Sequence, residues 1–427
     1  MNIQAIEVRA WGKRVGALAR DPKLDYIAFK YAPSWLNLGI QLAPLHMPLS
    51  DQTFIFPNLP EATFRRLPAM FADALPDDFG NALIDAWMAE RGTKKDDVTT
   101  MDRLAYMGKR GMGALEFRPA LGSHRESAEP LQMQSLVQEA RKAVEGVFSA
   151  DPHAKAALAN IIRVGTSAGG ARAKAVIAWN PETNQIRSGQ FDMASGFEPW
   201  LLKFDGVGKD FELGTGGDYG RTEYAYYKMA TQAGIVMSPS RLLEENDRAH
   251  FMTRRFDRDV IAGMTVKYHS QTLCAMAHLD YKQRGTHAYS QLFMTISELE
   301  LGDEALRQAF LRMTFNVMTR NYDDHTKNFS FLRKQERGWE LAPAYDVTHA
   351  HNPRGEWTYQ HLMSVNGKFD GIARADLLAE AERFSVPRAE KLIVDVRSAI
   401  ENWSDHAQSA GLQEDKTQEL RRDFLLL

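Results

Sequence analysis

The chain has 427 residues, more than the roughly 250 that one hydrophobic core usually serves, so we expect two or three domains. Hydrophobic residues make up 44% of it and charged residues 25%, which are ordinary values for a globular protein and exclude a disordered or fibrous one. The 52 basic and 55 acidic residues give a net charge of −3, so any contact with DNA has to be local or made through a partner.

A single cysteine, Cys274, excludes a disulfide framework and a cysteine metal cluster within one chain. The first residues interleave polar and apolar side chains and do not form the apolar core of a signal peptide. No apolar run in the sequence reaches the length of a transmembrane helix. We therefore expect a cytoplasmic protein without membrane contact.

Residues 3–31 alternate apolar and polar side chains in short stretches, which is typical of a small β-sheet. The segment 63–88 is rich in Leu, Phe and Ala and predicts helices that cover this sheet. Glycines at positions 108, 111, 113 and 122 indicate loops where this unit joins the next. Residues 133–148 carry apolar side chains at helical spacing and predict a helix that packs against a core.

The stretch from Gly165 to Lys174, GTSAGGARAK, connects two predicted strands at 161–164 and 175–179. A Rossmann or Walker turn would lead into a helix and needs a different glycine pattern, so neither fits. A glycine-rich hairpin does fit, because backbone N–H groups without covering side chains can approach phosphate oxygens. The alternative is that the segment is only a turn between two strands.

Lys203 lies among apolar residues in the next predicted strand, 199–205, where a lysine needs an anionic partner. In kinases, the strand after the glycine-rich hairpin carries a lysine that holds the phosphates and pairs with a helix glutamate. Glu223 begins a predicted helix over 223–233 and has the position of that glutamate. Lys203 could instead belong to an edge strand and reach solvent.

Residues 250–258 predict a strand and a charged turn, at the place where a kinase has the hinge between its lobes. Beyond residue 258 the pattern turns helical, with helices expected over 292–300, 305–320 and 387–403. We therefore expect a helical lobe in this part of the chain.

Polar side chains are concentrated between residues 321 and 328, after the second of these helices. Asp323 and Asn328 have the spacing at which the catalytic loop of protein kinases places its aspartate and its magnesium-binding asparagine. Asp346 follows a short apolar strand and could supply a second oxygen ligand for magnesium. The alternative is that these residues cap a helix and fill a turn through local hydrogen bonds.

With its motifs in this order, the chain resembles the HipA family of serine/threonine kinases, the toxins of HipBA-type bacterial toxin–antitoxin modules. The resemblance covers nearly the whole chain and implies an α+β, protein-kinase-like bilobal fold. Its parts would be a β-rich N-terminal subdomain (1–110), a kinase N-lobe with the glycine-rich loop and strand lysine (111–258), and a helical C-lobe with the catalytic loop (259–427). The most specific matching segments are Gly170-Ala171-Arg172-Ala173-Lys174, Arg255-Phe256-Asp257-Arg258, Asp323-Asp324-His325-Thr326-Lys327-Asn328 and Tyr345-Asp346.

The resemblance implies that the protein uses ATP and Mg²⁺. Asp323 would be the catalytic base, and Asn328 and Asp346 would bind magnesium. A second acid, Asp324, could be taken for the base, but the spacing to Asn328 favours Asp323. By position, ATP would contact Gly169, Gly170, Ala171, Arg172, Ala173, Lys174 and Lys203 at its phosphates, Arg254, Arg255 and Phe256 at its adenine, and His325, Lys327, Asn328, Tyr345 and Asp346 from the helical lobe.

Ser167 resembles, by its position in the glycine-rich loop, the serine that HipA-type kinases autophosphorylate, with Thr166 as a competing hydroxyl. A phosphate there would repel the phosphates of ATP and switch the enzyme off. The resemblance also implies a HipB-like helix-turn-helix antitoxin as partner, through which alone the protein would reach DNA. The expected target is a cytosolic protein of the translation apparatus, such as an aminoacyl-tRNA synthetase.

Other functions stay open from the sequence. The chain could be a non-catalytic corepressor bound to a DNA-binding antitoxin, although the complete set Lys203, Asp323, Asn328 and Asp346 favours a kinase. It could phosphorylate a non-protein substrate, because Asp323-Asp324-His325 also resembles the D-R-H of phosphoinositide kinases. It could be a metal-dependent hydrolase with Asp346, His349 and His351 as ligands.

Overall fold

The computed structural model of the protein describes residues 3–21, 23, 26–76, 78–121, 173–189, 193, 195–205, 218–245, 248–261 and 264–427. The chain divides into two compact units, each made of segments that are separate in sequence. The first unit comprises Met1–Gly208, Arg254–Gln271 and Leu332–Gly338. The second comprises Lys209–Thr253, Thr272–Phe331 and Trp339–Leu427.

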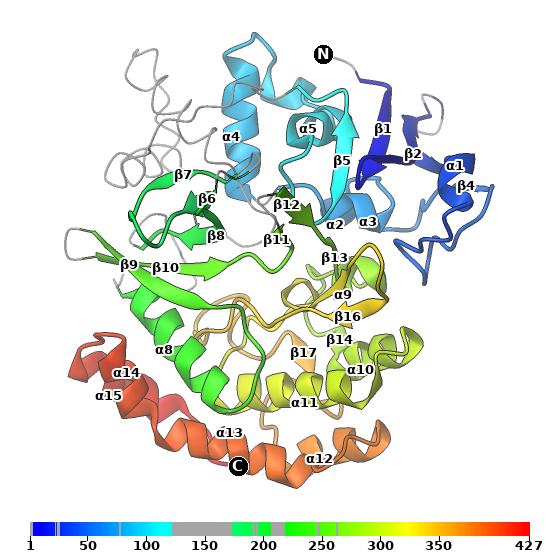
Figure 1. The fold of residues 1–427 in the computed structure, drawn as a ribbon. Coiled ribbons are helices and arrows are strands. Elements are labelled where there is room, and N and C mark those ends of the chain that lie inside the picture. Colours follow the sequence, from blue (N-terminus) through cyan, green and yellow to red (C-terminus); the bar gives the residue numbers. More distant parts are fainter. Residues whose placement is uncertain are drawn as a thin grey trace. The chain divides into compact units, whose positions relative to one another are not determined.

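Figure 1 shows the elements coloured along the chain. Those up to residue 118 are β1 (Ala5–Ala10), β2 (Lys13–Arg20), β3 (Ile27–Tyr31), α1 (Pro33–Leu36), β4 (Thr53–Phe54), α2 (Glu61–Phe64), α3 (Ala69–Ala72), α4 (Asp78–Ala89), the 3-10 helix η1 (Lys95–Asp97), α5 (Thr100–Met107) and β5 (Leu115–Arg118). They are followed by β6 (Lys174–Trp179), β7 (Ile186–Ser188), β8 (Glu198–Lys203), α8 (Tyr219–Gln232), β9 (Ser240–Glu245), β10 (Arg248–Arg254), β11 (Arg258–Ile261), β12 (Met264–Lys267) and β13 (His269–Thr272).

The remaining elements are mostly helical. They are α9 (Leu273–Met276), β14 (His287–Ala288), α10 (Tyr289–Glu298), α11 (Gly302–Met318), the 3-10 helix η2 (Thr326–Asn328), β15 (Ser330–Arg333), β16 (Trp339–Leu341), β17 (Met363–Ser364), α12 (Arg374–Arg383), α13 (Ala389–Glu401), α14 (Trp403–Ser409) and α15 (Glu414–Asp423).

The N-terminal strands form an antiparallel sheet in the order β4-β3-β2-β1-β5. In β1 every second side chain is buried, so one face of the strand faces the core. Trp11 and Gly12 form the two-residue turn between β1 and β2, with φ of 49° and 73°. Positive φ at both positions gives the turn a twist that matches the right-handed twist of the two strands. The β-rich N-terminal part expected from the sequence is therefore present.

The strands expected over 175–179 and 199–205 are confirmed as β6 and β8, which pair antiparallel. The strand β7 pairs with the other edge of β6. The predicted helix over 133–148 and the predicted strand over 161–164 lie outside the described residues.

The chain does not turn helical directly after residue 258, as the sequence had led us to expect. Instead it forms β11, β12 and β13, of which β11 and β12 are an antiparallel pair. Val260, Met264 and Val266 are separated by multiples of two residues. This spacing is typical of a strand, in which every second side chain faces the same way, and the helical interpretation overlooked it. The later helices are confirmed as α10, α11 and α13.

In the second unit α11 packs against α10 and α13, and α8 packs against α13 and α14 (Figure 1). Side chains of α11 are buried along most of the helix, which makes it the central element of this core. The loop with the candidate catalytic residues begins at the C-terminal end of α11, so its position is set by the best-packed helix of the unit.

Asp257 holds the segment after β10 against the N-terminal subdomain. Its fully buried carboxylate accepts hydrogen bonds from Arg255 Nε and Nη2 at 2.9 and 2.7 Å, from Arg258 Nη1 at 2.7 Å and from the Gly113 N–H at 2.7 Å. Arg258 Nη2 also donates to the Gly111 carbonyl at 2.9 Å. Burial alone would raise the pKa of Asp257, but the two arginines lower it to about 2. Its stabilising contribution is therefore present above the ordinary aspartate pKa of about 3.9 and is lost as pH falls through about 2.

We expect Asp257→Asn to lower the free energy of unfolding of the first unit by about 3–5 kcal/mol, because it leaves the buried Arg255 and Arg258 guanidinium groups without a counter-charge. Urea unfolding followed by tryptophan fluorescence measures this change.

The control is Asp259→Asn, which removes a carboxylate that is 42% exposed and lies 3.5 Å from Arg254. Surface pairs of this kind contribute about 0–1 kcal/mol, so the control should unfold close to the unmodified protein. Equal stability of the two variants would show that the buried carboxylate is not needed to hold this segment.

Candidate active site

The loop that carries Asp323 is held by backbone pairing to the segment that follows Asp346. Arg320, with φ of 57°, turns the chain out of α11. The Tyr322 N–H then donates to the Ala350 carbonyl at 3.2 Å, and the Ala350 N–H donates to the Arg320 carbonyl at 3.1 Å. The two segments that carry the candidate aspartates are thereby fixed to each other within one unit.

The two neighbouring acids of this loop have opposite environments. The side chain of Asp323 is 49% exposed. The Asp324 carboxylate is fully buried and accepts hydrogen bonds from Tyr289 Oη, His361 Nδ1 and the Leu362 N–H, each at 2.7 Å. A carboxylate with these buried partners orients the loop, whereas Asp323 can reach a reacting hydroxyl group. Asp323 is thus the more accessible of the two acids, and its role as the base stays a prediction.

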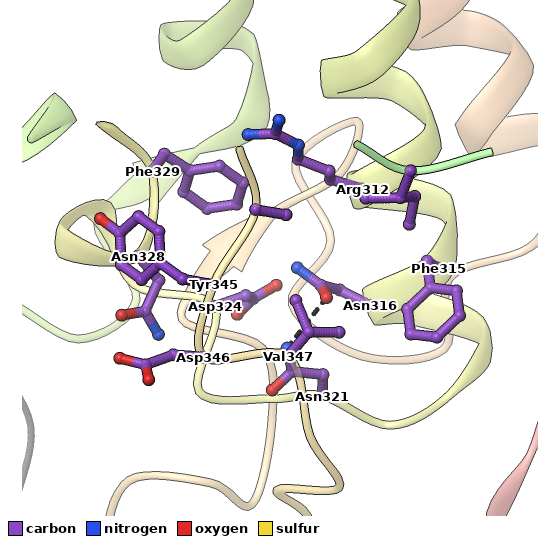
Figure 2. A pocket seen from close by; sticks show the side chains of 12 residues that line it. Arg312, Phe315, Asn316, Asn321, Asp324, Asn328, Phe329, Tyr345, Asp346 and Val347 are labelled. Atoms are coloured by element: carbon purple, nitrogen blue, oxygen red, sulfur yellow. Dashed lines mark hydrogen bonds between the residues drawn. The ribbon is translucent and has the colours of Figure 1, made fainter. Parts of the chain in front are cut away.

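A chain of buried hydrogen bonds connects the start of the loop to Asp324. Asn321 Nδ2 donates to Asn316 Oδ1 at 2.9 Å, as Figure 2 shows. Asn316 Nδ2 donates to Tyr289 Oη at 2.9 Å, and Tyr289 Oη donates to Asp324. Burial first, and the charge of Asp324 second, raise the pKa of Tyr289 well above its ordinary value, so this phenol remains a donor. Sequence reasoning missed Asn316, Tyr289 and His361.

Asn328 and Asp346 line the same pocket of the second unit, an open hollow of about 310 Å³. The Asn328 Nδ2 donates to the Asp323 carbonyl at 2.6 Å, which orients the amide so that its oxygen is the atom it can offer to a ligand. In Figure 2 the Asn328 amide and the Asp346 carboxylate lie on the same side of this pocket. The pocket is lined by Ile235, Arg312, Phe315, Asn316, Asn321, Asp324, Asn328, Phe329, Ala344, Tyr345, Asp346 and Val347.

The segment before Asp346 is anchored on both sides. The Ala344 N–H donates to the Val236 carbonyl at 2.8 Å. Tyr345 Oη donates to the Lys327 carbonyl at 2.6 Å, so Tyr345 ties this segment to the 3-10 helix η2. Asp346 itself has φ of 51°, a left-handed conformation that Asp tolerates better than most side chains.

Arg312 is a further residue that the sequence did not single out. It is 5% exposed and lines the pocket from α11, and its Nη2 donates to the Ala342 carbonyl at 2.7 Å. Burial lowers the pKa of Arg312 to about 10, which leaves it charged at neutral pH. A buried cation that holds the strand leading to Asp346 both positions that residue and favours anions in the pocket.

His325 and Lys327 lie at the outer edge of the loop with Tyr281. The His325 and Tyr281 rings are 5.3 Å apart, and Lys327 Nζ lies 4.8 Å from the centre of the Tyr281 ring. His325 Nε2 is 3.7 Å from Asp323 Oδ1. Of the two predicted ligand residues, His325 is thus close to the candidate base.

In the first unit, Lys174 on β6 is paired in register with Lys203 on β8. Both lysines are buried, with 5% and 7% exposure, and residues directly opposite in an antiparallel pair point to the same face of the sheet. Ala173, just before β6, accepts the Phe204 N–H at 3.1 Å and continues the pairing. Two ammonium groups on one face can both donate hydrogen bonds to an anion.

The three residues expected beside adenine, Arg254, Arg255 and Phe256, differ in how far their side chains are buried. The Arg255 side chain is buried against Asp257 and is used to hold the fold, so only its backbone is suited to contact a base. Arg254 lies 3.5 Å from Asp259 with a third of its side chain exposed, and Phe256 is half-buried. Adenine contact by these residues stays a prediction.

Gly169, Gly170, Ala171 and Arg172, and also Ser167 and Thr166, lie outside the described residues. Glu223 is 3% exposed in α8 and belongs to the second unit, so its pairing with Lys203 stays a prediction.

The hydrolase alternative needed Asp346, His349 and His351 at one metal. The two histidines instead meet Asp423, which accepts from His349 Nε2 at 2.9 Å and lies 3.3 Å from His351 Nδ1. The hydrogen bond from His349, followed by that from His351, outweighs burial and lowers the pKa of Asp423 to about 2. Asp346 is not part of this group, so the cluster expected from the sequence is not formed.

The donor atoms at the two predicted sites fit the ligands expected for them. A carboxylate and an amide oxygen, from Asp346 and Asn328, are the hard ligands that Mg²⁺ takes together with phosphate and water. Lys174 and Lys203 offer ammonium groups of the kind that hold phosphates.

Family profiles match most of the chain. The profile of the HipA-like C-terminal domain matches residues 166–404, which is more than half of the sequence, and that of the HipA N-terminal domain matches residues 6–118. The chain belongs to the HipA family. Among curated proteins, none matches it.

Two solved structures resemble the chain to different degrees. One is the HipA of a complex described as the Shewanella oneidensis MR-1 toxin–antitoxin system HipA, HipB and its operator DNA. It superimposes with a TM-score of 0.69 at 18% identity, over 98% of this chain and 94% of that one. A second, the Helicobacter pylori proinflammatory kinase CtkA, has a TM-score of 0.34 at 12% identity, over 55% of this chain and 90% of that one.

The HipA match confirms the expected fold class, an α+β kinase-like fold with a β-rich N-terminal part. The three-part division of the chain at residues 110 and 258 stays a prediction. In the described part of the chain, no helix is both long and apolar enough to cross a membrane.

We expect Tyr289→Phe to destabilise this HipA-family protein by about 1–3 kcal/mol, because the loss of one hydroxyl leaves Asn316 Nδ2 and an oxygen of Asp324 without their buried partner. Hydrogen exchange of residues 321–331, measured by mass spectrometry, should become faster.

The matched control is Tyr359→Phe, which removes a hydroxyl from a residue that is 46% exposed. It should change neither stability nor exchange. Exchange of the loop at the unmodified rate in Tyr289→Phe would contradict a role of this hydrogen-bond chain in orienting the loop.

Proposed function

We propose that this HipA-family protein is an ATP- and magnesium-dependent serine/threonine protein kinase that acts as the toxin of a toxin–antitoxin system. The observation that carries the proposal is the arrangement within the second unit. An exposed Asp323 follows the end of α11 and lies next to the Asn328 amide, which shares a pocket with the Asp346 carboxylate. Catalysis of phosphoryl transfer consists mainly of positioning and charge stabilisation, and these residue types supply both.

Each residue has a separate task in this proposal. Asp323 accepts the proton of the acceptor hydroxyl as its oxygen attacks the terminal phosphorus, and ADP leaves. Asn328 and Asp346 would hold Mg²⁺, which when bound neutralises charge on the phosphates. Lys174 and Lys203, which are paired in register in the first unit, are the proposed phosphate contacts implied by the family resemblance. Asp324 keeps the loop in place without taking part in the transfer.

We favour a kinase over a non-catalytic corepressor as the function of this protein. Lys203, Asp323, Asn328 and Asp346 are all present in the sequence, a complete set that a protein without catalysis does not need. We propose a protein as the acceptor of the phosphoryl group, in preference to a smaller molecule, because the chain belongs to the HipA family.

A HipB-like helix-turn-helix antitoxin is the proposed partner. The HipA that shares this fold is described in a complex with HipB and operator DNA. A net charge of −3 provides no general attraction to DNA, so we propose that the antitoxin makes the main DNA contact. The cytoplasmic location, an aminoacyl-tRNA synthetase as target and inactivation by phosphorylation of Ser167 stay predictions from the family resemblance.

We expect Asp323→Ala to slow phosphoryl transfer about 10²–10⁴-fold, the usual contribution of a general base, while ATP affinity stays nearly unchanged. Transfer from labelled ATP is measured on the purified protein and on proteins of a cell lysate, and ATP affinity by calorimetry. The control Asp303→Ala removes an exposed carboxylate from the first turn of α11 and should be fully active. Transfer at the unmodified rate in Asp323→Ala would remove this residue from the mechanism.

We expect Mg²⁺ to bind measurably only together with ATP, because two protein oxygens do not complete its octahedral shell. Calorimetric titration of the nucleotide-free protein with Mg²⁺ should give little heat. In the presence of ATP, Asp346→Asn should raise the Mg²⁺ concentration needed for half-maximal binding at least about tenfold.

Asp303→Asn serves as the control for the loss of one carboxylate and should bind Mg-ATP normally. Tight binding of Mg²⁺ without nucleotide, or the same Mg²⁺ dependence in both variants, would speak against Asp346 as a ligand.

A further inference from the structure

His349, His351 and Asp423 form a cluster that the proposed kinase mechanism does not use. The nitrogen atoms His349 Nε2 and His351 Nδ1 both point at Asp423 Oδ2, at 2.9 and 3.3 Å. One ligand atom from each of the three residues lies within 4.8 Å of the other two. Asp423 ends α15 and is more than seventy residues away in sequence, so the tertiary fold and not a local turn creates this convergence.

The backbone presents the two histidines on one side. Ala350 between them is buried and forms a parallel bridge with Asn321, and its N–H and carbonyl are both used in pairing. In an extended segment, side chains two residues apart point the same way, so His349 and His351 both face away from Ala350. A His-x-His pair of this kind is fixed before any ligand arrives.

Asp423 is held just as firmly from the other side. Arg320 Nε donates to the Asp423 carbonyl at 3.0 Å. Two residues on, the Leu425 N–H donates to the Met318 carbonyl at 2.8 Å. The end of α15 is thus fastened to the C-terminal end of α11, and the Asp423 carboxylate is presented by a backbone with little freedom to move.

We propose that His349, His351 and Asp423 form a binding site for a transition-metal ion of the Zn²⁺ class. In tetrahedral zinc sites with metal–ligand distances of about 2.0–2.1 Å, neighbouring ligand atoms are about 3.3 Å apart. The two histidine nitrogens lie 2.9 and 3.3 Å from Asp423 Oδ2, near that value, and all three ligand atoms are within 4.8 Å of one another. Two imidazoles and one carboxylate are a common zinc ligand set, which leaves a fourth position for water.

The exposure of the cluster agrees with this assignment. The side chains of His349 and His351 are 14% and 18% exposed and that of Asp423 is 37% exposed, so an ion can enter from solvent. Imidazole ligands favour Zn²⁺ over Mg²⁺, which binds oxygen almost only. The site is therefore chemically distinct from the proposed magnesium ligands Asn328 and Asp346.

A bound ion would restrain the loop with the candidate base. Ala350 pairs with the backbone of Tyr322, the residue before Asp323. The rings of Tyr322 and His351 lie 4.9 Å apart. Metal binding would link the end of α15 to this segment, and we expect slower hydrogen exchange in residues 319–324 when Zn²⁺ is bound.

The competing explanation is that the three residues form only a hydrogen-bonded group in which both imidazoles donate to the carboxylate. This group would hold α15 in place without any affinity for metal. The two explanations differ in one measurable property, the binding of Zn²⁺ by the nucleotide-free protein.

The experiment titrates the full-length, nucleotide-free protein with Zn²⁺ in the presence of a chelator of known affinity, and follows the visible absorption of Co²⁺ as a geometric probe. We expect one ion per chain and the intense absorption of four-coordinate Co²⁺. His349→Ala and His351→Ala should each weaken binding more than about tenfold, with unchanged circular dichroism.

Two control variants separate this site from others. His406→Ala removes a histidine whose Nε2 contacts Gln232, and it should bind Zn²⁺ like the unmodified protein. Asp346→Asn should also retain binding, and loss of binding in this variant would place the ion at the hydrolase-type site considered from the sequence. Less than one ion per chain, or affinity unchanged in both His349→Ala and His351→Ala, would overturn the proposal.

Discussion

The buried carboxylate of Asp324 is the interaction on which the candidate active site depends. An ionised carboxylate inside a protein is tolerated only when donors surround it. Its donors, Tyr289, His361 and the Leu362 N–H, come from segments on both sides of it in sequence. The loop can therefore adopt its conformation only after α10 and the segment around residue 361 have packed against α11, which makes the loop a product of the completed core.

Two adjacent aspartates acquire different tasks from this arrangement. Because Asp324 points into the core to reach its donors, the neighbouring side chain of Asp323 is directed outward, where half of it is exposed. The chain of hydrogen bonds through Asn316 and Tyr289 then fixes the loop at Asn321 as well, two residues before Asp323. Restraints on both sides of Asp323 thus hold its backbone in place, while about half of its side chain (49%) remains exposed.

The sequence predicts the local parts of this site well and the distant parts poorly. The spacing of Asp323 and Asn328, the lysine in β8 and the helix before the loop are all visible in a short window, and the structure contains each of them. The partners of Asp324 are not visible, because nothing local to Tyr289 or His361 indicates where it will pack. The sequence did contain a signal for Arg312 and Asn316. They are two polar residues four positions apart in a largely buried helix, and buried polar side chains need hydrogen-bond partners from elsewhere in the fold. Arg255 shows that a motif does not tell what its side chain contacts, since this side chain forms a buried ion pair with Asp257.

The charges of the paired lysines in the first unit bear on the nucleotide that we propose as ligand. Lys174 and Lys203 are opposite each other in register and nearly buried, so two ammonium groups lie on the same face of the β6–β8 pair. An anion that binds there stabilises the folded state by mass action, and it does so more as its concentration rises above its dissociation constant. The proposed nucleotide binding can therefore be tested at two places that share no residue, the lysine pair of β6 and β8 and the oxygen atoms of Asn328 and Asp346.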